Sequence, residues 1–226
     1  MSDLIDTTEM YLRTILELEE EGHVPMRARI SERLDQSGPT VSETVARMEK
    51  NGLVVVSDDR HLELTDSGRK LATEVMRKHR LAELLLREVI GLDWHLVHEE
   101  ACRWEHVMSE QVEKRILELV PEYHESPFGN PVPGLEMLGV ASAKTIHDQV
   151  YPLLEQLDQE VTLSRIAEPL QVYPDVLAHL KAAEILPGAP IMAVSNGNRI
   201  EISHLLTQHS VSLTAFDAAH IFVKPL

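Results

Sequence analysis

This 226-residue sequence lacks disulfide-forming cysteine pairs, long hydrophobic runs and an excess of basic residues. Its single cysteine excludes an internal disulfide and agrees with a reducing compartment, where a thiolate is free to bind metal. No apolar run approaches the roughly 18 residues needed to span a bilayer, and the first residues lack the basic and apolar regions of a signal peptide. We therefore expect a cytoplasmic protein with no membrane partner.

The net charge is −16 at pH 7, and such an acidic sum argues against nucleic-acid binding. The local distribution of charge matters more than the sum, however. Hydrophobic residues make up 43% of the chain, which gives enough core for one large domain or two to three small ones.

Two short helices joined by a tight polar turn are predicted over residues 27–50. The second helix has Ser37 as its N-cap, tolerates Pro39 in its first turn and stops at Asn51-Gly52. An amphipathic helix over residues 4–20 precedes them. This arrangement is typical of a helix-turn-helix.

A β-hairpin is predicted next, because residues 53–56 and 62–64 flank a polar turn, and such a hairpin would form a wing. Between residues 27 and 60, six basic residues balance six acidic ones, so this module is neutral within an acidic chain. Ser37, Thr40 and Ser42 offer small donors suited to phosphates beside a helix N-terminus. Helix-turn-helix folds also serve as protein-interaction modules, but we favour DNA.

Two long helices are expected to follow. The first runs from Thr65 to about Ile90 and is closed by Gly91, and the second runs from about Trp94 to Val120. Their apolar residues are too many for one narrow seam, so part of this surface is expected to bury against a second subunit. These residues are Leu81, Leu84, Leu85, Val89, Val97, Ala101, Trp104, Met108 and Ile116.

Four strong metal-ligand types stand at spacings 0, +4, +7 and +8 in the second long helix: His98, Cys102, Glu105 and His106. In a helix these side chains share one stripe, and the thiolate disfavours magnesium and calcium. The preceding helix carries a second pair, His79 and Glu83, one turn apart. Such pairs are also common on solvated faces. We favour a metal site, and the spacing leaves open whether it holds one ion or two.

The C-terminal part has a different pattern. Three prolines and two glycines within residues 126–134 predict a rigid loop. After about Tyr151, alternating apolar residues predict strands, residues 174–185 have a helical period, and Asn196-Gly197 predicts a tight hairpin. We expect a small β-barrel with one helix, so the fold class is mainly α with an α+β appendage.

These segments together resemble the diphtheria toxin repressor and iron-dependent regulator family of metal-sensing repressors. The resemblance is specific over roughly residues 1–140 and looser thereafter. It rests on the segments DTTEMYLRT (6–14), RARI (27–30), SGPTVS (37–42), VARME (45–49), MRKHRLAE (76–83), ACRWEHVMS (101–109) with His98, and SPFGN (126–130).

The resemblance implies a winged helix-turn-helix DNA-binding domain (1–73), a helical metal-binding and dimerisation domain (74–140), and a linker with an SH3-like domain (141–226). It also implies two metal ions per chain. The regulatory site would be Met10, Cys102, Glu105 and His106, and the ancillary site His79, Glu83, His98, Glu168 and Gln171. An anion would lie near Arg80, Ser126 and Asn130.

The resemblance further implies a homodimer that binds double-stranded operator DNA, with one or two dimers per operator. The residues expected at the DNA are Thr7, Arg27, Ala28, Ser37, Pro39, Thr40, Ser42, Glu43, Arg47, Lys50 and Arg60. At position 43 the sequence departs from the family, whose members carry Gln there. Gln can donate to and accept from adenine, whereas Glu only accepts and favours the cytosine amino group.

Met10 and Cys102 indicate the metal, because the manganese-sensing branch of the family uses harder ligands at these positions. We expect Fe²⁺, with Co²⁺, Ni²⁺, Zn²⁺ or Mn²⁺ as substitutes, and an iron-activated repressor of iron homeostasis genes. The alternatives are a manganese-responsive repressor, a metal-dependent hydrolase or a metal-storage protein. The sequence has no His-Glu-x-x-His motif and no obvious general base, so we do not expect an enzyme.

Overall fold

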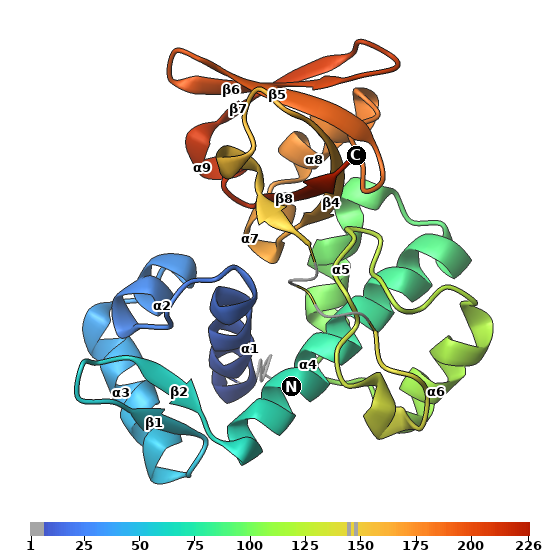
Figure 1. Ribbon diagram of the computed structural model, residues 1–226. Helices are drawn as coiled ribbons and strands as arrows, with labels where there is room; N and C mark the ends of the chain where they lie inside the picture. Colours follow the sequence, from blue (N-terminus) through green and yellow to red (C-terminus); the bar gives the residue numbers. More distant parts are fainter. Residues whose placement is uncertain (1–6, 144–145, 147–148) are drawn as a thin grey trace.

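The computed structural model describes residues 7–143, 146 and 149–226, which form three regions (Figure 1). The N-terminal region packs against one end of a long helix, α4, and a six-stranded sheet lies above the other end. The N-terminal elements are α1 (Thr7–Glu20), α2 (Arg27–Arg33), α3 (Gly38–Lys50), β1 (Val54–Val56) and β2 (Leu62–Leu64).

The helix-turn-helix prediction is confirmed. Ser37 caps α3 by accepting a hydrogen bond from the Thr40 N–H at 3.4 Å, and α3 ends at Lys50 with Asn51 as its C-cap. Strands β1 and β2 pair antiparallel, with Val54 opposite Leu64, and form the predicted wing. The helices and the wing share a core of apolar side chains. Its buried members are Tyr11, Leu12, Ile15, Leu16, Leu18, Ile30, Val41, Val45, Met48, Val54, Leu62, Ala72 and Met76.

Helix α4 (Asp66–Leu84) begins where the sequence predicts, because the Thr65 side chain accepts a hydrogen bond from the Gly68 N–H at 3.0 Å. Gly68 is required for close packing: a Cβ there would lie 1.9 Å from the Leu53 carbonyl oxygen. The helix continues as one π-helical segment, η1 (Leu85–Ile90). It ends at Gly91, whose φ of 77° is the left-handed conformation of a helix stop.

The prediction of one continuous helix from Trp94 to Val120 is wrong. The chain forms a 3₁₀ turn, η2 (Trp94–Leu96), then α5 (Val97–Trp104) and, after a break, α6 (Glu110–Leu119). Ser109 followed by acidic residues in the first turn of α6 is a helix-start signal that the apolar period concealed. Within the break, the buried Glu105 carboxylate pairs with Arg13 and His79.

The C-terminal region is a six-stranded antiparallel sheet with the order β3-β8-β4-β5-β6-β7. Its strands are β3 (Tyr151–Pro152), β4 (Glu160–Ile166), β5 (Pro190–Asn196), β6 (Arg199–His204), β7 (Ser210–Thr214) and β8 (Ile221–Pro225). Three short helices accompany them: α7 (Glu168–Gln171), α8 (Pro174–Ala182) and α9 (Ala215–Ala218). The 3₁₀ turns η3 (Leu135–Leu138) and η4 (Leu153–Glu155) lie before and within this region.

Three details of this region differ from the prediction. It has three helices among the described residues rather than one, because α7 and α9 are single turns too short to show a period. The polar strand β7 was not predicted. The tight hairpin is present one residue later than expected, since Asn196 pairs with Arg199 and the turn is Gly197-Asn198. The SH3-like likeness and the domain limits at 73 and 140 stay predictions.

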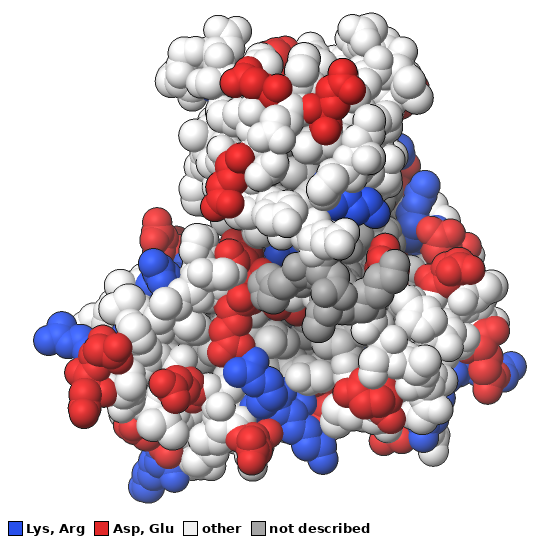
Figure 2. Space-filling view, in the orientation of Figure 1, with Lys and Arg blue, Asp and Glu red and all other residues white. Residues whose placement is uncertain are grey.

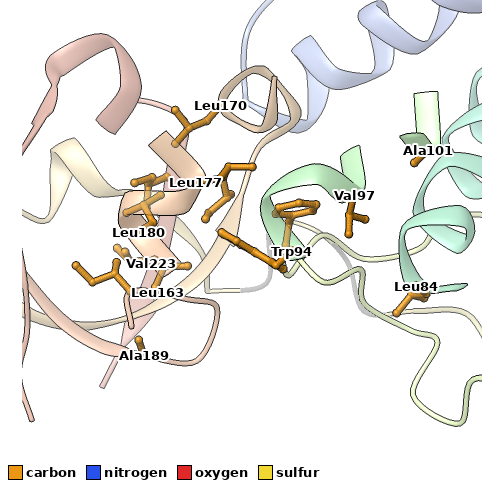
Figure 3. Close-up of a cluster of buried hydrophobic side chains, with 14 of the residues drawn as sticks. Leu84, Trp94, Val97, Ala101, Leu163, Leu170, Leu177, Leu180, Ala189 and Val223 are labelled. Carbon is orange, nitrogen blue, oxygen red and sulfur yellow. The ribbon is translucent and has the colours of Figure 1, made fainter. Parts of the chain in front are cut away.

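The C-terminal region packs firmly on the helical region. Helix α8 lies against η2, and Trp94 lies beside Leu177 at this contact (Figure 3). The Trp94 indole N–H donates to the Pro127 carbonyl oxygen at 2.9 Å, and its ring lies 4.8 Å from that of Phe128. One apolar cluster therefore runs from α4 and α5 into the sheet.

The C-terminal region also contacts the end of α1. The Arg165 guanidinium donates to the Glu20 carbonyl oxygen at 2.8 Å, and the Arg80 guanidinium on α4 donates to the Glu20 carboxylate at 3.1 Å. Helix α1 is thus tied to α4 and to the sheet at its C-terminal end. Among the described residues, no helix is long and apolar enough to cross a membrane.

Candidate metal centre

A cluster of possible metal ligands lies where α4 and α5 pack together. The ligand atoms of His79 on α4 and of His98 and Cys102 on α5 all lie within 4.8 Å of one another. The two helices bring these side chains together because each presents them on the face that it buries against the other. His79 and His98 are buried, and Cys102 is half-buried.

Carboxylates join this cluster from both sides. His79 lies between two of them: its Nε2 is 2.9 Å from Glu83 Oε1 and its Nδ1 is 2.6 Å from Glu105 Oε2. His98 Nδ1 lies 3.2 Å from His79 Nε2, and His98 Nε2 lies 3.5 Å from Cys102 Sγ. Cys102 and Glu105, which the resemblance assigns to one site, therefore form one continuous network with His79, Glu83 and His98, which it assigns to the other.

An arginine that the sequence reasoning missed lies inside this network. The Nη1 of Arg13, on α1, is 2.6 Å from Glu105 Oε2, 3.5 Å from Cys102 Sγ and 3.3 Å from His79 Nδ1. Its Nε donates to Glu17 at 2.7 Å. A search for metal donors passes over a cation. The one available signal is its position a single helical turn after Met10.

The charges of the cluster reinforce one another. Burial raises the pKa of the Cys102 thiol, but Arg13 and the neighbouring imidazoles outweigh burial and hold that pKa well below its ordinary value. Burial likewise opposes ionisation of Glu105, yet Arg13 and His79 lower its pKa to about 2. The environment therefore stabilises the thiolate and carboxylate forms, which are the forms that bind a cation.

His106 lies at the edge of the network, and Met10 lies on α1 one turn before Arg13. Met10 is half-buried on α1. His106 lies in the turn after α5, with its Nε2 3.3 Å from Glu105 Oε1 and its Nδ1 2.6 Å from Glu9 Oε2. Glu9 was not predicted as a partner. His106 reaches the cluster through Glu105, because these neighbouring side chains lie together where the helix breaks.

Glu168 and Gln171, on α7, are buried but make other contacts. Glu168 Oε1 accepts a hydrogen bond from Arg80 at 2.7 Å, and the Gln171 amide donates to the Ile166 carbonyl at 2.7 Å. Two buried oxygens, Glu83 Oε2 and Gln171 Oε1, accept no hydrogen bond within the part of the chain that the structure describes. Glu83 lies beside the imidazoles of His79 and His98, so its buried oxygen without a donor fits the chemistry of a bound cation.

The residues expected at DNA lie on one module. Arg27 is half-buried. The others are exposed: Thr7, Ala28, Ser37, Pro39, Thr40, Ser42, Glu43, Arg47, Lys50 and Arg60. Seven of them belong to α3 or cap it, and Arg60 lies in the turn of the wing with a φ of 69°. In the view of Figure 2, basic and acidic side chains are interspersed over the lower left of the molecule, where Figure 1 places α2, α3 and the wing.

Comparison with known families agrees with both the candidate metal site and the candidate DNA-binding module. A family model described as the N-terminal DNA binding domain of iron dependent repressors matches residues 3–62. A second, described as the metal binding and dimerisation domain of iron dependent repressors, matches residues 65–134. Together they match more than half of the chain. The chain belongs to the iron-dependent repressor family.

Similar proteins are found over most of the chain. The diphtheria toxin repressor of Corynebacterium diphtheriae is 54% identical over 206 residues, covering 90% of this chain and 91% of that protein. The iron-dependent repressor IdeR of Mycobacterium tuberculosis is 55% identical over 195 residues, covering 84% of this chain and 85% of that one.

Solved structures give the same fold. A manganese-dependent transcriptional repressor in complex with manganese matches with a TM-score of 0.81 and 26% identity, over 97% of this chain and 100% of that chain. The IdeR of T. acidophilum matches with a TM-score of 0.76 and 26% identity over the whole of both chains. Members of the iron-dependent repressor family are transcriptional repressors and not enzymes. Its two domains indicate DNA, a metal ion and a second subunit as partners.

Arg80, Ser126 and Asn130, where the resemblance implies an anion, each have hydrogen-bond partners within the protein. Arg80 donates to the Pro131 carbonyl oxygen at 2.6 Å as well as to Glu168 and Glu20. The Ser126 hydroxyl accepts from the Phe128 N–H, and the Asn130 amide donates to the Ile166 carbonyl. These groups have protein partners, and the anion site stays a prediction.

Proposed function

We propose that this protein is a transcriptional repressor that ferrous iron activates, and that it binds operator DNA as a homodimer in the cytoplasm to control iron homeostasis genes. The observation that carries the proposal is the buried network of imidazoles, thiolate and carboxylates that α1, α4 and α5 share. This network contacts α1 through Arg13, and α1 also forms part of the core of the DNA-binding module.

The donor set supports iron. Thiolate and imidazole suit Fe²⁺ better than Mn²⁺, which prefers oxygen ligands, and Cys102 lies within 4.8 Å of both imidazoles of the cluster. Relatives that are 50–55% identical over most of the chain are named diphtheria toxin repressor or iron-dependent repressor. Co²⁺, Ni²⁺, Zn²⁺ or Mn²⁺ would substitute when supplied alone, since several of them bind such donors more tightly than Fe²⁺.

Two ions per chain are proposed. Met10, Cys102, Glu105 and His106 would hold the regulatory ion. His79, Glu83, His98 and Gln171 would hold the ancillary ion, with Glu168 joining them on leaving Arg80. The partnerless oxygens of Glu83 and Gln171 support the second set. When bound, each ion supplies a Lewis-acid link between donors on different helices.

The chain's own contacts provide a route from the cluster to the DNA. Met10 and Arg13 lie on α1, while Tyr11 of the same helix is fully buried in the DNA-binding module. The Tyr11 hydroxyl donates to the Gln36 side chain, immediately before the N-cap of α3. A shift of α1 that brings Met10 toward Cys102 would therefore reposition α3, which carries the proposed groove contacts.

Exposed apolar side chains support the homodimer. Val89 and Ile90 at the end of η1 are 49% and 55% exposed, and Leu96 is 38% exposed. Isolated apolar side chains on a surface are ordinary, but these three end or begin neighbouring segments of the region described as the dimerisation domain. Two-fold symmetry would place two α3 helices on successive half-sites, with one or two dimers per operator.

The proposal is tested by selecting duplexes from a randomised DNA pool with the ferrous protein under anaerobic conditions. Binding of the selected DNA is then measured by fluorescence anisotropy with Fe²⁺, with Mn²⁺ and with a chelator. We expect tight binding with Fe²⁺, weaker binding with an equal concentration of Mn²⁺, and loss of binding with chelator. Equal binding in chelator would contradict metal activation. Metal-dependent folding without DNA affinity would instead indicate metal storage.

A further inference from the structure

Arg13 is the only arginine or lysine among the described residues with nitrogen atoms in contact with both Cys102 and Glu105. Its side chain is 10% exposed, so solvent screens these contacts little. One guanidinium nitrogen, Nη1, lies within 3.5 Å of a thiolate sulfur, a carboxylate oxygen and an imidazole nitrogen. These are the three ligand types of a transition-metal site.

The contacts of Nη1 and of a metal ion exclude one another. A hydrogen-bond donor and a cation that bind the same lone pairs of Cys102 Sγ and Glu105 Oε2 cannot occupy the same space. A metal ion and a guanidinium placed side by side in a buried site would also repel each other, because both are positively charged. An ion held by Cys102 and Glu105 must therefore displace the Nη1 end of Arg13.

Arg13 has a position to which it can withdraw. Its Nε donates to Glu17 Oε1 at 2.7 Å, and Glu17 lies one turn further along α1, away from Met10. Glu17 also lies 3.6 Å from Arg33 in α2, so this carboxylate already faces the DNA-binding module. The Arg13 side chain can keep one ion pair while it gives up the contacts with Cys102 and Glu105.

We propose that Arg13 is a resident counter-cation that competes with the activating metal ion, and that it thereby sets the metal concentration at which the regulatory site fills. The inference rests on the metal-binding role in the proposed function. Arg13 would also limit the response to scarce metal, because filling the site requires both the ion and the withdrawal of a paired guanidinium. Met10 and Arg13 lie one turn apart, so ligand recruitment and guanidinium withdrawal act on the same helix.

The chain offers a matched control in Arg77. This α4 arginine is also buried, with its Nε 2.6 Å from Glu113 Oε2 and its Nη1 3.1 Å from the Gly134 carbonyl oxygen. It touches none of the proposed metal ligands. Replacing either arginine by glutamine removes one buried cation, together with two ion pairs at Arg13 and one at Arg77. Only at position 13 does the change remove a competitor for metal.

The test is a Co²⁺ titration of the full chain, followed by the thiolate-to-cobalt charge-transfer absorption and repeated in competition with a chelator of known affinity. We expect Arg13→Gln to tighten Co²⁺ binding by about 10-fold, and Arg77→Gln to leave it within about 2-fold of the wild type. Thermal unfolding in chelator should show both variants destabilised. Added Co²⁺ should raise the unfolding midpoint of Arg13→Gln by more than it raises the midpoints of Arg77→Gln and the wild type.

Equal or weaker Co²⁺ binding by Arg13→Gln would overturn the proposal and leave Arg13 a structural residue. If that variant does not fold in chelator, Arg13→Lys carries the test, because a single ammonium cannot span the three contacts and its Co²⁺ affinity should exceed that of the wild type. Co²⁺ binding is read without DNA. Tightening in a protein that fails to bind any duplex would therefore uphold the counter-cation and reject only the repressor function.

Discussion

The core of the DNA-binding module and the seam between α1, α4, α5 and α7 are both buried, but they are built from opposite materials. The module is closed by apolar side chains such as Ile15, Val45 and Met48, all fully buried. The seam buries charged and titratable groups instead. These are Arg13, Glu17, His79, Arg80, Glu83, His98, Glu105 and Glu168.

This difference assigns stability to the apolar core of the module and the response to metal to the charged seam. Burial of apolar surface stabilises a fold directly, whereas buried charges cost desolvation energy and offset it only when well paired. In the seam a charge can have several partners: Glu105 contacts Arg13, His79 and His106. A region with interchangeable ionic partners can take up an ion by exchanging contacts, which an apolar core cannot do.

The largest expected effect is that of Cys102→Ala. We expect metal-dependent DNA binding to weaken by about 100-fold or more, beyond what the loss of a group that only supports a ligand usually costs. The measurement is anisotropy of a selected duplex at fixed Fe²⁺, with sedimentation to check that the dimer persists. Normal repression by this variant would show that the regulatory site is elsewhere.

Met48→Ala is the control for that experiment. Met48 is fully buried in the apolar core of the module, so its truncation should lower the free energy of unfolding by about 2–5 kcal/mol. Its Co²⁺ affinity should stay that of the wild type. A large change in metal affinity here would remove the distinction between the two regions.

Glu83→Gln should have the next largest effect. This carboxylate is fully buried between His79 and His98, and the change keeps its shape but removes its charge. We expect Co²⁺ binding at the ancillary site to weaken by about 10-fold, with a smaller loss of DNA binding than Cys102→Ala causes. Isothermal titration calorimetry of both variants measures Co²⁺ binding, and anisotropy measures DNA binding. Equal losses of DNA binding in the two variants would contradict a regulatory site that matters more for DNA binding than the ancillary site.

A pH-dependent effect is expected at Glu21, which links the module to the sheet. It accepts from Arg33 at 2.6 Å and lies 2.9 Å from His220 Nδ1. Burial raises the pKa of Glu21, but His220 and Arg33 outweigh burial and lower it below its ordinary value. Because the folded pKa is the lower one, Glu21 stabilises the fold above the ordinary carboxyl range, and this stabilisation is lost as the pH falls.

Glu21→Gln should therefore cost about 1–2 kcal/mol near pH 7, and the difference from the wild type should shrink toward pH 4. Urea unfolding in chelator at several pH values measures it. A difference that stays constant with pH would mean that the ionised form of Glu21 makes no special contribution.

The smallest expected effect is that of Glu43→Gln on the exposed face of α3. Removing a negative charge within a Debye length of phosphates should tighten binding by about 3- to 5-fold at low salt, and by less at high salt. The operator selected by the wild type should also favour cytosine at one position where the Glu43→Gln variant favours adenine. Unchanged affinity and base preference would mean that residue 43 points away from the groove.

Much of the fold could be predicted because its signals are local. Ser37, Thr65 and Gly91 mark helix ends by their own hydrogen-bonding and backbone preferences, and all three are where expected. The break after Trp104 contains Glu105, whose ion pairs join residues 26 and 92 positions away. A period of apolar residues cannot register such distant partners.

The candidate site was predictable in its donors but not in its arrangement. The i, i+4 pairs of His79 with Glu83 and His98 with Cys102 lie together as expected. Apart from its position one turn after Met10, Arg13 has no signature that separates it from a surface arginine of an amphipathic helix. The pairing of Glu168 with Arg80 joins residues 88 positions apart and could be found only from the fold.

The attachment of α1 at its middle and at its C-terminal end constrains how this protein can vary. Arg13 is tied to Glu105, and seven residues later Glu20 is tied to Arg80 and Arg165. One inserted or deleted residue between them would turn one set of side chains by about 100° relative to the other. Substitutions can accumulate along this helix while its length stays fixed. We expect relatives to differ in length at the turn of the wing, and not between positions 13 and 20.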